Sequence, residues 1–203
     1  MTPESTTSRV QAAPHRAEAI VIGVSAGALD ALSTLLPVLP RDFPLPVLVV
    51  VHLPAHKESL IVNLLRPKCQ VDVREAEDKE PIRAATVFFA PPDYHMLVET
   101  DGRLSLSAEE PVNFSRPSID VLFETAADAY GAGLIGIVLT GANNDGSRGL
   151  RAVLDRGGIG LVQRPDLAIA SAMPAAALDA CPTARALSLP EIAAYLLNIV
   201  QSA

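Results

Sequence analysis

The sequence predicts a doubly wound α/β fold: a mostly parallel sheet with helices on both faces and one antiparallel hairpin. Short apolar runs rich in β-branched residues alternate with segments whose apolar residues recur at helical spacing. Hydrophobic residues make up 49% of the 203 residues, which suits a buried sheet. A segment between residues 86 and 107 breaks the alternation and has the pattern of antiparallel strands.

The expected strands of the parallel sheet are short and apolar, as strands buried on both faces are. They are Ala19–Val24, Val47–His52, Val71–Glu75, Leu134–Thr140 and Ile159–Gln163. Antiparallel strands are expected at Thr86–Ala90, His95–Thr100 and Arg103–Ser107, the last two joined by a type I′ turn at Asp101-Gly102.

The expected helices carry apolar residues on one face and follow the strands in order. They are Ala28–Leu36, Lys57–Leu65, Ser118–Ala129, Ser147–Arg156, Pro174–Ala180 and Pro190–Gln201. Pro117 is tolerated as a first helical residue, or Ser118 is itself the cap of its helix.

Composition limits the classes of function. Residues 1–18 are mostly polar and lack an apolar core of the secretory kind, so we expect a disordered tail or linker before one domain of residues 19–203. A net charge of −7 and a pI near 5.0 argue against nucleic acid or an anionic membrane as partner. Cys69 and Cys181 fit no metal or redox spacing and indicate a cytoplasmic protein. No run reaches the roughly 20 apolar residues of a membrane span.

Gly23-Val24-Ser25-Ala26-Gly27 lies where the first strand turns into the first helix. Small residues around a serine permit a tight turn that exposes one hydroxyl over the edge of the sheet, as in a nucleophile elbow. Gly-rich turns of this kind also bind phosphates or simply pack tightly, so both interpretations stay open until partners for Ser25 are found.

A serine nucleophile needs a general base, and four histidines are available. His15 lies in the polar segment, and His56 has the sequence context of a solvated side chain. His95 opens a hairpin strand and is either structural or part of the site's rim. His52 ends the apolar run 47–51, which places it at the carboxyl edge of the sheet, where α/β proteins bind ligands; a hydrogen-bonded histidine at a strand end is the alternative.

The acid is expected at a third strand end. Asp145 follows the apolar run 134–140, so it either orients His52 or caps the helix that begins near Ser147. The backbone N–H groups of Ala26 and Ala142 are candidate donors to a developing oxyanion. The order Ser, His, Asp argues against an ordinary α/β-hydrolase, in which the histidine comes last.

These residues carry a resemblance that extends over roughly residues 19–200. The chain resembles the catalytic domain of the chemotaxis protein-glutamate methylesterase family. The matching segments are Ile22–Gly27, His52–Pro54, Glu75–Asp78, Phe89–Met96, Ser115–Phe123, Leu139–Gly146 and Met173-Pro174.

The resemblance implies a serine hydrolase in which Ser25 is the nucleophile, His52 the base and Asp145 the acid. It implies demethylation of glutamate methyl esters on a methylated chemoreceptor or similar helical signalling protein, with release of methanol and deamidation of receptor glutamines as a further activity. No metal or cofactor is expected. Arg116, in the family's Arg-Pro-Ser stretch, either binds substrate or is a loop arginine bonded to backbone carbonyls.

Three positions depart from the family's pattern. Ala28 stands where the family has glycine, and a Cβ there would cost about 1 kcal/mol if the position needs positive φ. Ala142 replaces a methionine, and Asn143 replaces a glycine at a position where asparagine tolerates left-handed backbone.

The family's receiver domain would not fit in the segment before Ala19, so we expect either an enzyme without that control or a separate regulatory receiver protein.

Two other functions compete with a stand-alone methylesterase. One is a catalytically silent or regulatory binding module with the same fold, which would release no methanol and leave Ser25 unlabelled by a serine reagent. The other is a nucleotide-binding protein, disfavoured because the turn lacks a Gly-x-Gly-x-x-Gly pattern and a ribose-binding acid.

Overall fold

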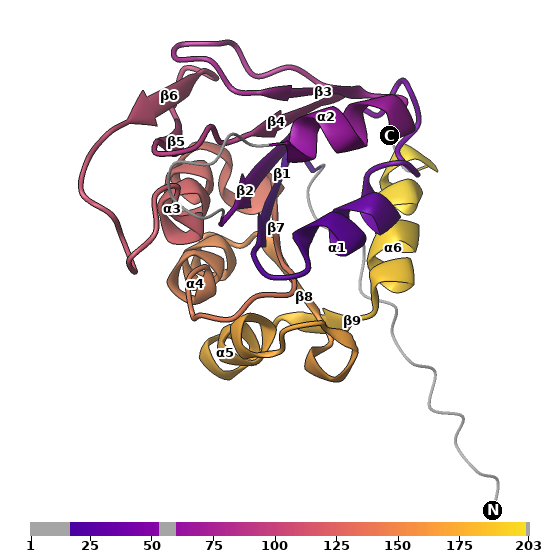
Figure 1. Cartoon of the computed structure of the whole chain (residues 1–203), viewed down its shortest axis with the longest axis vertical. Helices are drawn as coiled ribbons and strands as arrows, with labels where there is room; N and C mark the ends of the chain where they lie inside the picture. Colours follow the sequence, from indigo (N-terminus) through magenta and orange to yellow (C-terminus); the bar gives the residue numbers. More distant parts are fainter. Residues whose placement is uncertain (1–16, 53–59, 202–203) are drawn as a thin grey trace, which may run out of the picture.

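A seven-stranded, all-parallel sheet forms the centre of the computed structural model, which describes residues 17–52 and 60–201 (Figure 1). Its strands lie in the order β3-β4-β2-β1-β7-β8-β9. Their bounds are β1 Ala19–Val24, β2 Val47–Val51, β3 Asp72–Glu75, β4 Thr86–Phe89, β7 Leu134–Val138, β8 Ile159–Gln163 and β9 Arg185–Leu187. The predicted doubly wound α/β fold is confirmed.

Six α-helices and three short 3-10 helices connect the strands within the described residues. The α-helices are α1 Ala28–Leu35, α2 Ile61–Leu65, α3 Ile119–Tyr130, α4 Ser147–Asp155, α5 Ala172–Ala180 and α6 Leu189–Gln201. The 3-10 helices are η1 Arg66–Lys68, η2 Gly131–Gly133 and η3 Pro165–Leu167. Each predicted helix exists within a few residues of its expected bounds, except that the start expected at Lys57 and its neighbour His56 lie outside the described residues, as does His15.

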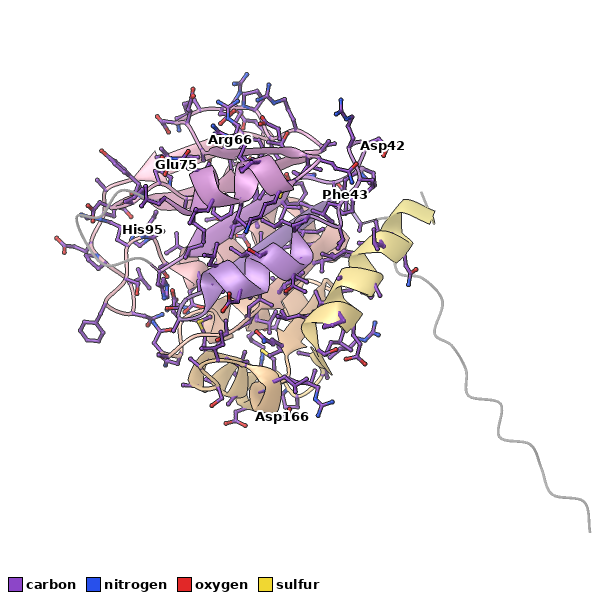
Figure 2. The ribbon with its side chains drawn as sticks, turned by 45° about the vertical axis from the view of Figure 1, so that its right-hand side comes forward. Asp42, Phe43, Arg66, Glu75, His95 and Asp166 are labelled. Atoms are coloured by element: carbon purple, nitrogen blue, oxygen red, sulfur yellow. The ribbon has the colours of Figure 1, made fainter. Side chains whose placement is uncertain are left out.

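Two hydrophobic cores lie on opposite faces of the sheet because alternate side chains of a buried strand point to opposite sides. Helices α1, α2 and α6 cover one face, where Ile20 and Ile22 of β1 meet Leu32 and Leu196. Helices α3, α4 and α5 cover the other, together with the hairpin of β5 (His95–Val98) and β6 (Leu104–Ser107) (Figure 1). Phe43, labelled in Figure 2, belongs to the first core.

Strand β4 departs from the prediction. Residues 86–90 were expected in an antiparallel arrangement, but β4 lies between β3 and β2 and is parallel to both. All four of its residues are buried, as in the other central strands. Burial on both faces identifies a parallel strand better than its closeness in sequence to a hairpin.

The hairpin β5–β6 is confirmed, but its turn is not of type I′. A type I′ turn needs positive φ at both central residues, whereas Gly102 has φ 81° and Asp101 is not in the left-handed region. Gly102 N–H bonds Glu99 O, and Glu99 N–H bonds Arg103 O, so the four-residue turn 99–102 ends at a left-handed glycine. β9, of only three residues at the sheet edge, was not predicted because its sequence has no apolar alternation.

The first described residues, beside the predicted boundary between residues 18 and 19, already contact the rest of the domain. Glu18 N–H already bonds Gly133 O at 2.8 Å, and Ala17 packs against the first core. Residues 1–16 lie outside the described part, so the predicted tail stays a prediction. Within residues 17–52 and 60–201, no helix is long and apolar enough to cross a bilayer.

Candidate active site

Ser25 and His52 follow the last residues of two adjacent parallel strands. Val24 of β1 and Val51 of β2 are register partners, and His52 N–H donates to Val24 O at 3.1 Å. Neighbouring strands lie about 4.8 Å apart, so Ser25 and His52 are neighbours at the carboxyl edge of the sheet. The predicted convergence of these two residues on one edge therefore has its backbone basis.

The turn after β1 is tight because two glycines have neighbours that leave no room for a Cβ. A Cβ on Gly23 would lie 2.3 Å from Ile119 Cγ2. Gly27 has φ 86°, and a Cβ there would lie 3.0 Å from Ile169 and 3.1 Å from Thr140. Ala28 is the first residue of α1 and is helical, so the positive φ belongs to Gly27. The conformational cost considered for Ala28 does not arise.

Asp145 lies beside His52 and is fully buried. His52 Nε2 and Asp145 Oδ2 are 2.8 Å apart, and the His52 side chain is 10% exposed. The carboxylate also accepts N–H bonds from Ile119 (2.6 Å) and Asp120 (3.2 Å) and the hydroxyl of Ser118 (2.9 Å). These donors form the first turn of α3, so the positive end of this helix holds the acid.

The same contacts keep Asp145 ionised. Burial by itself would raise the pKa of Asp145, but hydrogen bonds from His52, Asn113 and Ile119 outweigh it and lower the pKa to about 2. A charged carboxylate accepts a proton-bearing Nε2, so Asp145 fixes which ring nitrogen of His52 carries hydrogen.

Helices α3 and α4 are capped reciprocally by each other's acids. Asp145 precedes α4 but binds the first turn of α3, whereas Asp120 of α3 accepts the N–H groups of Gly146 (2.9 Å) and Gly149 (2.7 Å) at the start of α4. The alternative that Asp145 caps the helix it precedes is therefore wrong. Burial raises the pKa of Asp120, and the neighbouring Asp145 carboxylate raises it further. The hydrogen bond from Gly149 acts in the opposite direction without cancelling these effects.

The loop after β7 is anchored under the serine turn. Ser25 N–H bonds Thr140 O at 2.9 Å, and Thr140 Oγ1 donates to Ala26 O at 2.7 Å. A Cβ on Gly141 would lie 2.6 Å from Cε of the buried Met173, so the backbone at Gly141 packs directly against this side chain. The two predicted oxyanion donors belong to segments that these bonds hold together.

Comparison with known proteins gives this geometry a family. Residues 20–196 match the model of the family described as CheB methylesterase. The chain belongs to the CheB methylesterase family.

Relatives in this family differ in how much of their length corresponds to this chain. A Leptospira interrogans protein with the name "Putative protein-glutamate methylesterase/protein-glutamine glutaminase" is 46% identical over 185 residues, which is 91% of this chain and 96% of that protein. An Archaeoglobus fulgidus protein-glutamate methylesterase/protein-glutamine glutaminase is 36% identical over 79% of this chain but only 47% of its own length. The crystal structure of the Thermotoga maritima CheB methylesterase catalytic domain superposes with a TM-score of 0.85 at 28% identity, covering 90% and 98% of the two chains.

Two asparagines of this family member contact His52 and Asp145, and sequence reasoning did not identify these contacts. Asn113 Nδ2 donates to both Asp145 Oδ1 and Asp120 Oδ2 at 2.9 Å. Asn143 Nδ2 lies 3.3 Å from His52 Nδ1. Asn143 was noted only for its tolerance of left-handed backbone, but its φ is not positive; in its own loop Gly146 is the left-handed residue, with φ 95°.

The remaining candidates have structural contacts. Arg116 Nη1 donates to the carbonyls of Ala108 (2.8 Å) and Glu109 (3.0 Å), as the loop interpretation expects. His95, labelled in Figure 2, is buried; its Nδ1 accepts Ser118 N–H at 3.1 Å, and its Nε2 faces Glu110 O. His95 thus supports the segment before α3. No metal-binding group of three or more His, Cys, Asp or Glu occurs among residues 17–52 and 60–201.

Proposed function

We propose that this chain is a serine hydrolase that demethylates glutamate methyl esters on chemoreceptor-type proteins. Ser25 is the nucleophile, His52 the general base and Asp145 the acid that orients it. The observation that carries the proposal is the 2.8 Å pair of His52 Nε2 and Asp145 at the strand end beside Ser25. Membership in the CheB methylesterase family supports it.

In this proposal the two ring nitrogens of His52 have different tasks. Nε2–H donates to Asp145, so Nδ1 carries the lone pair that takes the Ser25 proton. In many serine hydrolases the acid binds Nδ1 and Nε2 is the base; here the two nitrogens exchange roles. The buried Asp145 carboxylate stabilises the imidazolium that forms when Nδ1 is protonated.

The reaction then runs through an acyl-enzyme. Ser25 Oγ attacks the ester carbonyl while its proton moves to His52 Nδ1, and that proton leaves with methoxide as methanol. Water attacks the acyl-enzyme with His52 again as base, releasing the glutamate carboxylate and restoring Ser25. The N–H groups of Ala26 and Ala142 bind the developing oxyanion; within the described residues neither has a hydrogen-bond acceptor.

A glutamine side chain passes through the same acyl-enzyme. In that case His52 gives its proton to the leaving amine, and ammonia is released in place of methanol. The names of the relatives, which include protein-glutamine glutaminase, support this second activity. An amide is the harder substrate because its leaving group must be protonated as it departs.

The partner we propose is a methylated helical signalling protein in the cytoplasm. With a net charge of −7, the chain gains little from long-range attraction to an acidic helix, so recognition depends on short-range contacts at the site. In this proposal Arg116, whose Nη1 is bonded to the Ala108 and Glu109 carbonyls, uses Nη2 to bind substrate carboxylates. Control by a separate receiver protein remains part of the proposal, and the chemistry above requires no cofactor.

Methanol release from methylated receptor preparations tests the function. We expect the wild type to release methanol and Ser25→Ala to fall by about 10³-fold or more, because removing a triad nucleophile leaves only binding and oxyanion stabilisation. Ser33→Ala is the matched control: its hydroxyl lies on α1, is buried and has no hydrogen-bond partner among the described atoms. It should keep wild-type activity.

The same preparation discriminates the silent module. A serine-directed phosphonate should label the wild type at Ser25 and leave Ser25→Ala unlabelled. Folded wild-type protein that neither releases methanol nor reacts with the phosphonate would support the binding module instead.

A further inference from the structure

His52, Asp145 and Asn143 form a closed ring of three hydrogen bonds. His52 Nε2 donates to Asp145 Oδ2 (2.8 Å), Asp145 N–H donates to Asn143 Oδ1 (3.3 Å), and Asn143 Nδ2 lies 3.3 Å from His52 Nδ1. Every residue in this ring uses a different group for each of its two neighbours. The ring thus constrains the imidazole at both nitrogens.

The ring also determines the direction of each bond. A backbone N–H can only donate, so the Asn143 atom facing Asp145 N–H is the carbonyl oxygen and the atom facing His52 is the NH₂ group. That NH₂ group needs an acceptor, which makes Nδ1 the unprotonated nitrogen. Asp145, which needs a donor, independently requires hydrogen on Nε2. Asn143 and Asp145, at the two nitrogens of the imidazole, therefore select the same tautomer.

We propose that Asn143 is a positioning residue whose carboxamide holds His52 in the Nε2–H tautomer and occupies the Nδ1 lone pair in the resting protein, leaving it when Nδ1 takes the Ser25 proton. The proposal rests on the proposed function only in taking Nδ1 as the base. The tautomer and the amide contact are properties of the resting protein and can be measured without substrate.

The amide contact has a cost for the base. When Nδ1 accepts the Ser25 proton, two N–H groups face each other, so Asn143 must turn away or move. The resting contact therefore has to break before Nδ1 can accept a proton. An aspartate at position 143 has the opposite effect, because one carboxylate oxygen can keep the Asp145 N–H while the other accepts a proton-bearing Nδ1.

The other charged groups around His52 stay constant in this comparison. In the described residues they are Asp145 in direct contact, Asp120 joined to it through Asn113, and Arg148, whose Nε lies 3.9 Å from Asp120. Each remains in place when position 143 changes.

The experiment follows the His52 ring by nitrogen NMR, with His52→Gln to assign its signals. In the wild type we expect the Nδ1 signal in the range of an unprotonated nitrogen and the Nε2 signal in that of an N–H. In Asn143→Asp the Nδ1 signal should move into the range of an N–H at a pH where the wild-type nitrogen is unprotonated, since the new carboxylate accepts a hydrogen there. The acid limb of the hydrolysis pH profile should move to higher pH.

Asn144→Asp is the matched control. It adds the same charge one residue away on an exposed side chain, and only its backbone carbonyl makes a described bond, to Ser147 N–H. Screening by water should leave the Nδ1 signal of this variant close to that of the wild type. Should Asn143→Asp fail to fold, Asn143→Ala replaces it, with a smaller change in the Nδ1 signal because only the opposing donor is lost.

Two results would overturn the proposal: a hydrogen on Nδ1 of the wild-type ring, or equal shifts in Asn143→Asp and Asn144→Asp. Neither depends on finding the receptor. A protein that shows the tautomer and the shift but releases no methanol would retain this assignment and refute the proposed function.

Discussion

Five donors converge on the carboxylate of Asp145. Oδ1 accepts from Asn113, Ser118 and Asp120, and Oδ2 accepts from His52 and Ile119. These donors fill the roughly four acceptor sites of a carboxylate, so protonating either oxygen loses at least one bond. Asp145 is therefore both part of the proposed chemistry and a structural ion of the fold.

Acid should destabilise the protein through this residue. The pKa of Asp145 is about 2 in the folded protein against an ordinary 3.8, so the group contributes stability above pH 3.8 that is lost as pH falls through 2. The contribution amounts to about 2 kcal/mol. Urea unfolding of wild type and Asp145→Asn is measured between pH 6 and pH 2. The difference between their free energies of unfolding should narrow by this amount below pH 4.

Asp120 makes a contribution of the opposite sign. Its raised pKa adds stability as pH falls through the folded value, and because it is present in both proteins it largely cancels in the comparison. A difference in unfolding free energy between wild type and Asp145→Asn that stays constant from pH 6 to pH 2 contradicts the prediction. If Asp145→Asn is unfolded throughout, Ser118→Ala, which removes one donor to Asp145, should show a smaller acid loss than the wild type.

At the scale of elements, the site depends on how α3 meets α4. A Cβ on Gly149 would lie 2.5 Å from Phe123 Cβ and 3.0 Å from Asp120 Cα, so a glycine there permits the close approach that brings Asp120 onto the N–H groups of α4. In return, the loop before α4 delivers Asp145 to the first turn of α3. Each helix thus completes the other's N-terminus.

Replacing Asp120 should test this pair of caps. Asp120→Ala leaves Gly146 and Gly149 N–H unpaired in a buried place, and we expect a loss of about 2–4 kcal/mol of unfolding free energy. Asp128→Ala is the control, since Asp128 lies on the same helix but its partner is the exposed Arg156; it should cost less than about 1 kcal/mol. Equal costs in denaturant unfolding would contradict reciprocal capping.

The sequence predicts the elements better than it predicts their partners. Strand ends locate Ser25, His52 and Asp145, because an apolar run that stops at a polar residue marks the carboxyl edge of the sheet. Asn113 could not be found this way: it lies in a loop without periodicity, between the bonded residues Val112 and Ser115. The exchange of caps is likewise a tertiary feature, and local rules assign Asp145 to the helix that follows it.

At the scale of the whole molecule, and among its described residues, only one of the two helical layers that cover the sheet carries groups of the candidate site. α1 and α6 close the first core, while α3 and α4 on the second face carry the groups that bind Asp145 and Asp120. The strand order was beyond the sequence, because parallel strands pair through helices and not through turns. For the same reason β4 was assigned to the hairpin that follows it.

Core truncations on the two faces should therefore separate stability from activity. Leu196 of α6 and Leu122 of α3 are both fully buried, and Leu→Ala at either should cost about 2–5 kcal/mol. Below its Tm, Leu196→Ala should hydrolyse ester near the wild-type rate, whereas Leu122→Ala should be slower because the first turn of α3 shifts under Asp145. Similar rates in two folded variants, measured by methanol release at 20 °C, would refute this division.

The convergence of donors on Asp145 also affects how the fold can evolve. Ser25 contributes its backbone to the turn, but its hydroxyl has no described hydrogen bond, so a mutation there removes chemistry without unpairing any buried group. A mutation at Asp145 leaves five donors without their acceptor. Descendants that give up hydrolysis and keep the fold are therefore expected to lose the serine first and retain the acid, so an aspartate at this position is poor evidence that a relative is active.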